Sequence, residues 1–220
     1  VEDSLFESRR PVAPVGLTSV KARRVSAVDF AARGSGPSTP VIGVVPGKII
    51  TERRQASLPF ADGMRRADTA QDVIKVAVVE RHGKNGNIGV GFVHGFGLQR
   101  GAIASTVGHD SHNICVVGVD DGDMAVAVNR LAEIEGGFVV AEGGRVLAEI
   151  ALPVAGLMSL MSHEQVRDAL IPLRQAAKAL GTTLPEPFLQ VAFLPLPVIP
   201  HLKITDMGLV DVDRFELIAA

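Results

Sequence analysis

Two strand-length apolar runs flank five consecutive polar residues near the middle of the chain, and this pattern restricts the fold most. The runs Ile103 to Val107 and Ile114 to Val119 are rich in β-branched residues, as buried strands are. Between them stands His109-Asp110-Ser111-His112-Asn113, which we call the polar loop. Two strands joined in this way place the polar side chains at one edge of a sheet, where binding and catalytic residues are common.

Other apolar runs of strand length surround this pair. Residues 41–45 and 48–53 predict a hairpin around a Pro-Gly turn, residues 73–81 a long strand, and residues 138–150 a hairpin around two glycines. The glycine-rich run 88–97 is expected to be a poor regular strand. Its glycines lack the G-x-G-x-x-G spacing of a phosphate-binding loop, so they indicate close packing of backbone instead.

Helical periodicity occurs in two places. Residues 124–134 carry apolar side chains on one side, and Asp121 or Asp123 is expected to cap the helix they form. A second helix is predicted from Ser162 to Leu180, because Ser162 and Gln165 have the spacing of a capping box.

The remaining segments are read mainly from their turn residues. Residues 33–40 are expected to form a loop, and the proline-rich stretch 185–200 at most a short strand at residues 188–193. Residues 201–211 have a hairpin-like pattern. The sequence therefore predicts an α+β fold with mixed or antiparallel sheets and two main helices, with sandwich-type strands near the N-terminus and no (β/α)₈ barrel.

Charge and composition exclude several classes of protein. The net charge of the 220 residues is −2 without a basic stripe, so we expect no nucleic-acid partner. No apolar stretch reaches the roughly 18 residues of a membrane span, so we expect no membrane partner. Cys115 is the one cysteine and lies in an apolar run, which fits a reducing compartment and predicts a cytoplasmic protein.

The polar loop offers several kinds of chemistry. His109 and His112 with Asp110 could bind a metal, an Asp-His pair could exchange protons, and Ser111 to Asn113 could hydrogen-bond a polar ligand. Alternatively, the loop is a turn whose polar groups satisfy buried backbone. No second ligand pair such as H-x-H occurs elsewhere, which argues against a metal site in this chain.

Three further titratable residues end the strongest predicted strand. Glu80, Arg81 and His82 could face the same pocket as the polar loop, or they could form an exposed, solvated strand end. We therefore take Glu80, Arg81 and His82, with His109, Asp110, Ser111, His112 and Asn113, as the candidate residues that face a substrate or an active site. None of them is assigned as catalytic with certainty, and none as a metal ligand.

An ordered set of segments resembles the C-terminal region of bacterial adenine deaminases, members of the amidohydrolase superfamily. The segments are Val76 to Gly83, Gly86 to Gly89, Gly95 to Leu98, Arg100 to Ser105, His109 to Asn113, Asn129 to Leu131, Leu152 to Ser159 and Leu196 to Pro200. The resemblance implies a hydrolase that converts adenine and water to hypoxanthine and ammonia. It further implies that a divalent metal, manganese or iron, activates the water that attacks C6 of adenine.

The resemblance also implies a missing part. Family members carry their metal ligands on an N-terminal (β/α)₈ barrel, which this strand-rich chain does not contain. Residues 1–55 would then belong to a small sandwich beside the barrel, and residues 56–220 would form the C-terminal α+β domain. The first residue is not Met, which agrees with a piece of a longer polypeptide. The expected partners are the barrel domain, adenine and further copies of the enzyme, and the metal is expected on the barrel.

Three functional hypotheses follow. In the first, the chain packs on the barrel, helps to close its active site and is inactive alone. In the second, it is a structural or oligomerisation domain without contact to substrate. In the third, His109, Asp110 and His112 make it a metal hydrolase in its own right.

Overall fold

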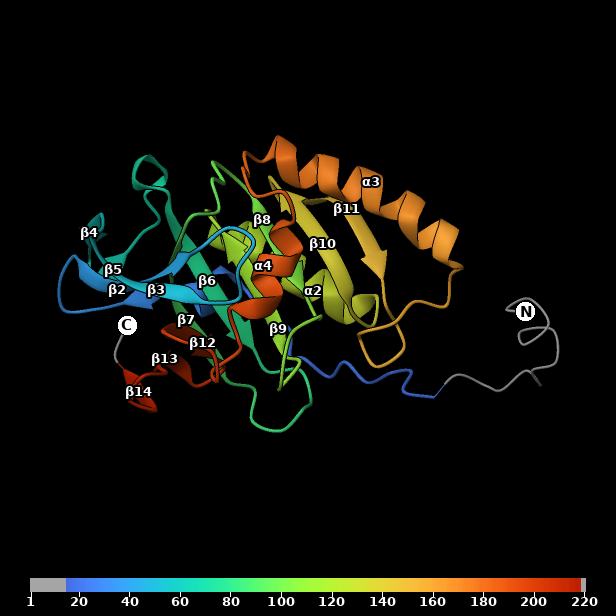
Figure 1. The fold of residues 1–220 in the computed structure, drawn as a ribbon, viewed down its shortest axis with the longest axis horizontal. Helices are drawn as coiled ribbons and strands as arrows, with labels where there is room; N and C mark the ends of the chain where they lie inside the picture. The colour runs from blue at the N-terminus through green and yellow to red at the C-terminus, as the bar shows by residue number, and fades with distance from the viewer. Residues whose placement is uncertain (1–14, 219–220) are drawn as a thin grey trace.

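An eight-stranded sheet forms the centre of the computed structural model, which describes residues 15–218 (Figure 1). In chain order its strands are β2 (Ser38–Val44), β3 (Thr51–Ser57), β6 (Val73–Val79), β7 (Ile88–His94), β8 (Ala102–Ser105), β9 (Ile114–Gly118), β10 (Gly137–Glu142) and β11 (Arg145–Ala151). The spatial order is β11-β10-β8-β9-β6-β7-β2-β3. Only β2 and β7 pair in parallel, and the other neighbours are antiparallel.

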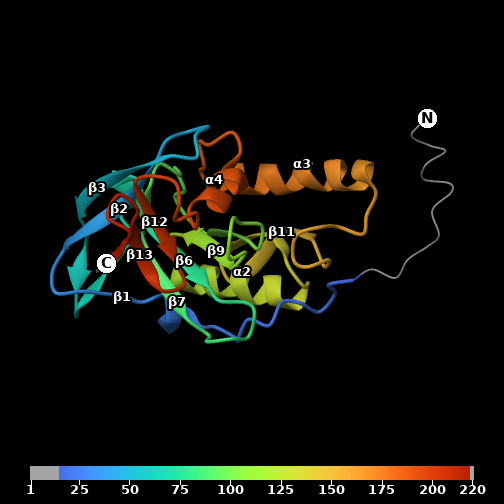
Figure 2. The same cartoon turned by 60° about the horizontal axis from the view of Figure 1, so that its bottom comes forward.

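Helices cover both faces of this sheet. Within the described residues, the α-helices are α2 (Asp121–Glu133), α3 (His163–Ala179) and α4 (Pro187–Phe193). Successive side chains of the central strand β6 point to opposite faces. Val76 and Val78 join a core with α3 and α4, whereas Ala77 and Val79 join a core with α2. The two layers of helices on either side of the sheet can be followed in Figures 1 and 2.

Two small sheets and two short 3₁₀ helices complete the described part. The first sheet consists of β1 (Ala32–Arg33), β5 (Met64–Arg65) and β4 (Phe60–Ala61), and the second of β12 (Leu202–Thr205), β13 (Gly208–Asp211) and β14 (Glu216–Ile218). The 3₁₀ helices are η1 (Ala27–Phe30) and η2 (Thr69–Gln71). The predicted α+β class is confirmed, and the described residues form no closed barrel.

Predictions from local signals are largely confirmed. The predicted hairpins correspond to β2–β3, β10–β11 and β12–β13. The capping box at the start of α3 is present, because Ser162 Oγ accepts a hydrogen bond from Gln165 N at 3.3 Å and Ser162 N donates to Gln165 Oε1 at 2.9 Å. The apolar residues 12–15 also predict a short strand or helix, but residues 12–14 lie outside the described part of the chain.

The expectation for the glycine-rich run is wrong in one respect. Residues 88–94 form the regular strand β7, which pairs with β6 along its whole length. The inference of close packing is correct, because a Cβ on Gly89 would lie 2.0 Å from Thr205 O. The glycines therefore let the β12–β13 hairpin approach β7 rather than weaken the strand.

Two more segments differ from their predictions because tertiary contacts decide them. Strand β2 begins at Ser38, inside the expected loop, since its pairing with β3 extends to Ser57. Residues 187–193 form α4 instead of a strand. Pro187 occupies the first turn of that helix, where proline is tolerated, and the helix buries Phe188 and Val191.

The acidic cluster before α2 also works differently from the prediction. Asp120, not Asp121 or Asp123, caps the helix by accepting from Asp123 N at 3.0 Å. Asp121 instead lies 2.6 Å from the ammonium of Lys75, a buried residue of β6. The Asp123 carboxylate accepts from the backbone of the β10–β11 turn at Gly143 and Gly144.

The proposed boundary at residue 55 falls within β3, and β2 and β3 belong to the same sheet as the strands that follow. The assignment of residues 1–55 to a sandwich beside a barrel stays a prediction. Within residues 15–218, no helix has both the length and the apolar character needed to cross a membrane.

Candidate functional site

The polar loop connects β8 to β9 and has an unusual backbone. Asp110 and His112 both adopt left-handed conformations, with φ of 61° and 48°. Aspartate and histidine tolerate this region better than most residues do. The resulting sharp turn exposes His109, Asp110 and Ser111, leaves His112 half-buried and buries Asn113. The five residues therefore divide into an exposed tip and a buried base.

Arg81 supports the buried base of the polar loop from the interior of the domain. Its side chain is 2% exposed, and its Nε donates to the backbone oxygen of His112. A second guanidinium nitrogen donates to Ala155 O at 3.0 Å, and Arg81 N donates to Asn113 Oδ1 at 3.3 Å. Burial lowers the pKa of Arg81 below its usual value. Arg81 thus acts on the loop through backbone and amide groups from the interior.

Glu80 organises the neighbouring turn, residues 82–87. Its buried carboxylate accepts from four backbone N–H groups, those of His82, Lys84, Asn85 and Gly86. Burial raises the pKa of Glu80, but these donors together outweigh it, so the pKa lies below its ordinary value of 4.5. The carboxylate is therefore used within the protein to fix a turn.

Asp206 completes the base of the site, although no sequence pattern pointed to it. Asp206 lies in the β12–β13 turn and accepts from Asn113 Nδ2 at 3.2 Å and from Asn85 Nδ2 at 3.5 Å. It is 93 positions from Asn113 in the sequence. The aspartate joins the polar loop, the 82–87 turn and the C-terminal hairpin.

The exposed tip consists of His82, His109, Asp110 and Ser111. The Nε2 atom of His82 lies 2.7 Å from Ser111 O. The ring of His109 stacks on Phe193 at the end of α4, with centroids 4.9 Å apart and planes 7° from parallel. The structure therefore brings His82 and the polar loop together and presents imidazole, carboxylate and hydroxyl groups on a supported turn.

His112 stands between base and tip. Its Nδ1 atom is buried and has no hydrogen-bond partner among the described residues. Buried polar atoms are normally paired, so an unpaired one requires an explanation. The loop thus keeps one hydrogen-bonding position that the described part of the chain does not use.

A metal does not fit the described residues. No group of three or more His, Cys, Asp or Glu side chains within residues 15–218 is arranged to hold an ion. His109 is stacked on Phe193 and His112 is half-buried, so the two imidazoles of the loop serve different contacts. We therefore assign no chemical step of this chain to a bound metal.

A cavity of about 580 Å³ lies at the opposite end of β8 and β9. Its lining includes Arg100, Asp123 and Glu142. Arg100 forms an ion pair with Glu142, and Asp123 accepts from the Gly143 and Gly144 amides. These three charged groups are therefore already engaged in contacts within the domain.

Comparisons with known proteins show the family to which this chain belongs. The family model described as "Adenine deaminase C-terminal domain" matches residues 48–216. The chain is 69% identical over 218 residues to "Adenine deaminase 1" of Agrobacterium fabrum (strain C58) and 62% identical over 218 residues to "Adenine deaminase" of Brucella melitensis (strain 16M). Each alignment covers 99% of this chain but 38% of the relative. The chain belongs to the adenine deaminase C-terminal domain family.

Proposed function

We propose that this domain is the accessory part of a full-length adenine deaminase and helps to close its active site. The reaction would be hydrolysis of adenine to hypoxanthine and ammonia, with the metal, manganese or iron, on a barrel domain outside this chain. The proposal includes a cytoplasmic location and assembly of several copies. The names of the relatives support the proposed reaction, and the share of their length that lies outside this chain supports a further domain.

The observation that carries the active-site role is the division of the polar loop into a fixed base and an exposed tip. Asn113 and Arg81 are 4% and 2% exposed and hold the base. Asp110 and Ser111 remain exposed in a left-handed turn. Polar groups that are fixed in this way can meet a bound substrate without a large loss of conformational freedom. The unpaired Nδ1 of His112 adds a hydrogen-bonding position at the same place.

The test is to replace Asp110 by alanine in the full-length enzyme, with Asp62→Ala as the matched control. Asp62 is also an exposed aspartate with a left-handed backbone, at φ of 53°, but it lies in the distant β4–β5 turn. We expect Asp110→Ala to lower kcat/KM for adenine by about tenfold or more, equivalent to ~1.4 kcal/mol of transition-state stabilisation. Asp62→Ala should leave kcat/KM unchanged, and both should shift Tm equally.

The alternative function is a structural or oligomerisation domain without contact to substrate. It is favoured by the extent to which Glu80, Arg81 and Asn113 are used inside the domain. If Asp110→Ala retains full kcat/KM, and Asn113→Ala lowers stability but not activity, the alternative is correct. In either case the 220-residue chain alone should release no ammonia from adenine in the presence of Mn²⁺, and turnover would contradict both proposals.

A further inference from the structure

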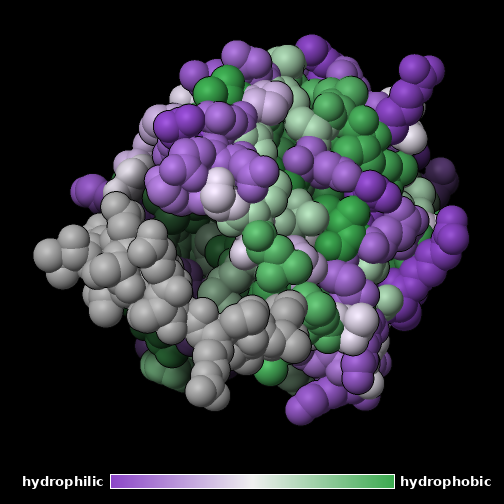
Figure 3. All heavy atoms as spheres, turned by 90° about the vertical axis from the view of Figure 1, so that its right-hand side faces the viewer, coloured by the Kyte–Doolittle hydropathy of each residue, from purple (hydrophilic) through white to green (hydrophobic). Residues whose placement is uncertain are grey.

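Exposed apolar side chains gather beside the polar loop, where the chain enters the domain and where β11 connects to α3. They are Val15 and Leu17 near the start of the described chain, and Met158, Leu160 and Met161 in the connection. We call these five residues the apolar patch. Figure 3 looks at this end of the molecule and shows hydrophobic side chains in the open. Met158 and Leu160 are 58% and 61% exposed, which is costly in water unless another surface covers them.

The two halves of the apolar patch are joined by the backbone. Ala155 N donates to Gly16 O at 2.8 Å, and Met158 N donates to Val154 O at 3.1 Å in the turn that follows. Ala155 and Gly156 adopt left-handed conformations there, and Thr106 Oγ1 donates to Gly156 O at 2.6 Å. The apolar side chains therefore stand on a turn that is fixed to the sheet.

Arg81 connects the apolar patch to the polar loop. Its side chain donates to Ala155 O in the patch-bearing turn and to His112 O in the loop. Its backbone oxygen accepts from Lys21 N in the entering segment at 2.7 Å. One buried residue thus sets the position of the apolar patch, the polar loop and the incoming chain relative to one another.

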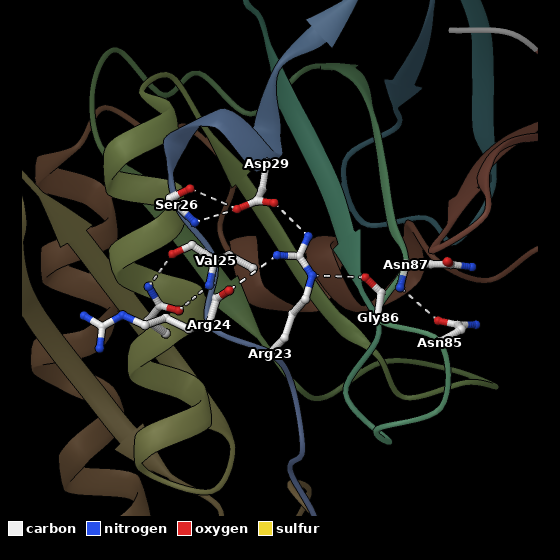
Figure 4. A network of polar contacts seen from close by, with 9 residues as sticks. Arg23, Arg24, Val25, Ser26, Asp29, Asn85, Gly86 and Asn87 are labelled. Carbon is white, nitrogen blue, oxygen red and sulfur yellow. Dashed lines mark hydrogen bonds and ion pairs between the residues drawn. The ribbon is translucent and has the colours of Figure 1, made fainter.

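The entering segment, residues 21–29, is held in place by polar contacts (Figure 4). Arg23 Nε donates to Gly86 O at 3.3 Å, and another of its nitrogens lies 2.7 Å from Asp29 Oδ1. Val25 exchanges two hydrogen bonds with the side chain of Asn129 on α2. The segment is therefore held against both the 82–87 turn and the helix.

We propose that the apolar patch is the surface on which the preceding part of the full-length polypeptide docks. This inference rests on the proposed function, and it names the contact that would hold the polar loop over an active site on that part. Two observations identify this occupant: the chain matches the C-terminal part of relatives of which it covers 38%, and Val15, the first described residue, belongs to the apolar patch. Because Val15 belongs to the apolar patch, the part of the polypeptide that precedes it is covalently tethered next to the patch, at high effective concentration.

Methionine oxidation in the intact full-length enzyme tests this docking. Hydrogen peroxide is applied to the native enzyme and to the urea-unfolded enzyme, and the oxidation rate of each methionine is read by mass spectrometry. Met124 is fully buried and gives the rate of a protected side chain. We expect Met158 and Met161 to react as slowly as Met124, several-fold below their unfolded rates, although they are 58% and 39% exposed in this domain. Rates close to the unfolded values would overturn the proposal.

Introducing a charge into the apolar patch provides a second test of docking. Leu160→Asp in the full-length enzyme should restore fast oxidation of Met158 and Met161. Leu217→Asp, at a leucine that is 54% exposed on β14, should leave both protected. If Leu160→Asp leaves both methionines protected, or if their protection disappears on dilution to single chains, the preceding part is not the occupant.

The oxidation assay is independent of catalysis. Protected methionines together with full activity of Asp110→Ala would keep the docking surface and reject the active-site role. Reactive methionines together with a loss of activity in Asp110→Ala would reject the docking surface and keep the active-site role.

Discussion

Replacing Gly89 by alanine should destabilise the domain more than any other glycine-to-alanine change in β7. A Cβ at this position would lie 2.0 Å from Thr205 O and 2.8 Å from Gly208 N. An ordinary carbon–oxygen contact is about 3.3 Å, so the β12–β13 hairpin would have to retreat by about 1.3 Å. Both obstacles are backbone atoms, so no change of side-chain rotamer can relieve them.

The size of the effect follows from what the hairpin buries. Leu202, Ile204 and Leu209 are fully buried and belong to the core that includes Val76 and Val78. Overpacking of such a site costs about 1–3 kcal/mol. The loss of chain entropy in the unfolded state on replacing glycine by alanine returns about 0.4–1 kcal/mol. Because both obstacles are backbone atoms, the upper end of the overpacking range applies, and ~3 kcal/mol less this gain leaves a net loss of about 2 kcal/mol in the free energy of unfolding.

Two other glycines provide matched controls. At Gly91 the nearest atoms are the side-chain ends of Leu209 and Ile204, at 3.0 Å and 3.5 Å, which can move aside. At Gly36 there is no atom within 4 Å. Urea unfolding of the chain should therefore place Gly91→Ala and Gly36→Ala within about 1 kcal/mol of the wild type. If Gly89→Ala has the same midpoint as Gly36→Ala, the argument for close approach of the hairpin is refuted.

Two further predictions concern buried charges and can be measured as the free energy of unfolding against pH. Glu80→Gln should cost about 2 kcal/mol near neutral pH, since hydrogen bonds to a charged acceptor are lost. The pKa of Glu80 is lowered in the folded state, so the stability difference between wild type and Glu80→Gln is complete above pH 4.5 and should shrink as the pH falls through the folded pKa. A stability difference that persists unchanged in strong acid would contradict the role given to the Glu80 carboxylate. Lys203 is fully buried and donates to Ile49 O and Phe193 O, and burial lowers its pKa from 10.5 to about 8. Between pH 8 and 10.5 the unfolded chain binds more protons at Lys203 than the folded chain does. The wild type should therefore gain stability relative to Lys203→Met as the pH rises from 8 towards 10.5. Parallel curves of unfolding free energy against pH for the two proteins would show that the Lys203 ammonium is not desolvated.

Local signals in the sequence were sufficient for much of the fold. The hairpins were predicted from short apolar runs and their turns, and the start of α3 from Ser162 and Gln165, because in each case the determining residues are neighbours in the chain. The resemblance to adenine deaminases, read from ordered segments, is confirmed by the family match over residues 48–216. A family match does not, however, say what each side chain contacts.

The errors share a physical cause, which is contact between distant segments. Gly89 lies in a regular strand because the β12–β13 hairpin needs the space of its missing side chain. Asp121 does not cap α2 because Lys75, 46 positions away, takes its carboxylate. Residues 187–193 are helical because the helix buries Phe188 and Val191 in the core. None of these partners could be identified from local sequence.

The candidate site also depends on a contact between distant segments, and this contact leads to a further prediction. From the sequence, His82 could lie either beside the polar loop or at an exposed strand end, and nothing pointed to Asp206, which holds Asn113 and Asn85 from the C-terminal hairpin. Asp206 lies in the turn that packs against Gly89, so a retreat of the hairpin must also pull on Asn113. Gly89→Ala should therefore speed hydrogen exchange in residues 109–113, whereas Gly91→Ala should not. Unchanged exchange in the polar loop of Gly89→Ala would mean that Arg81 alone holds its base.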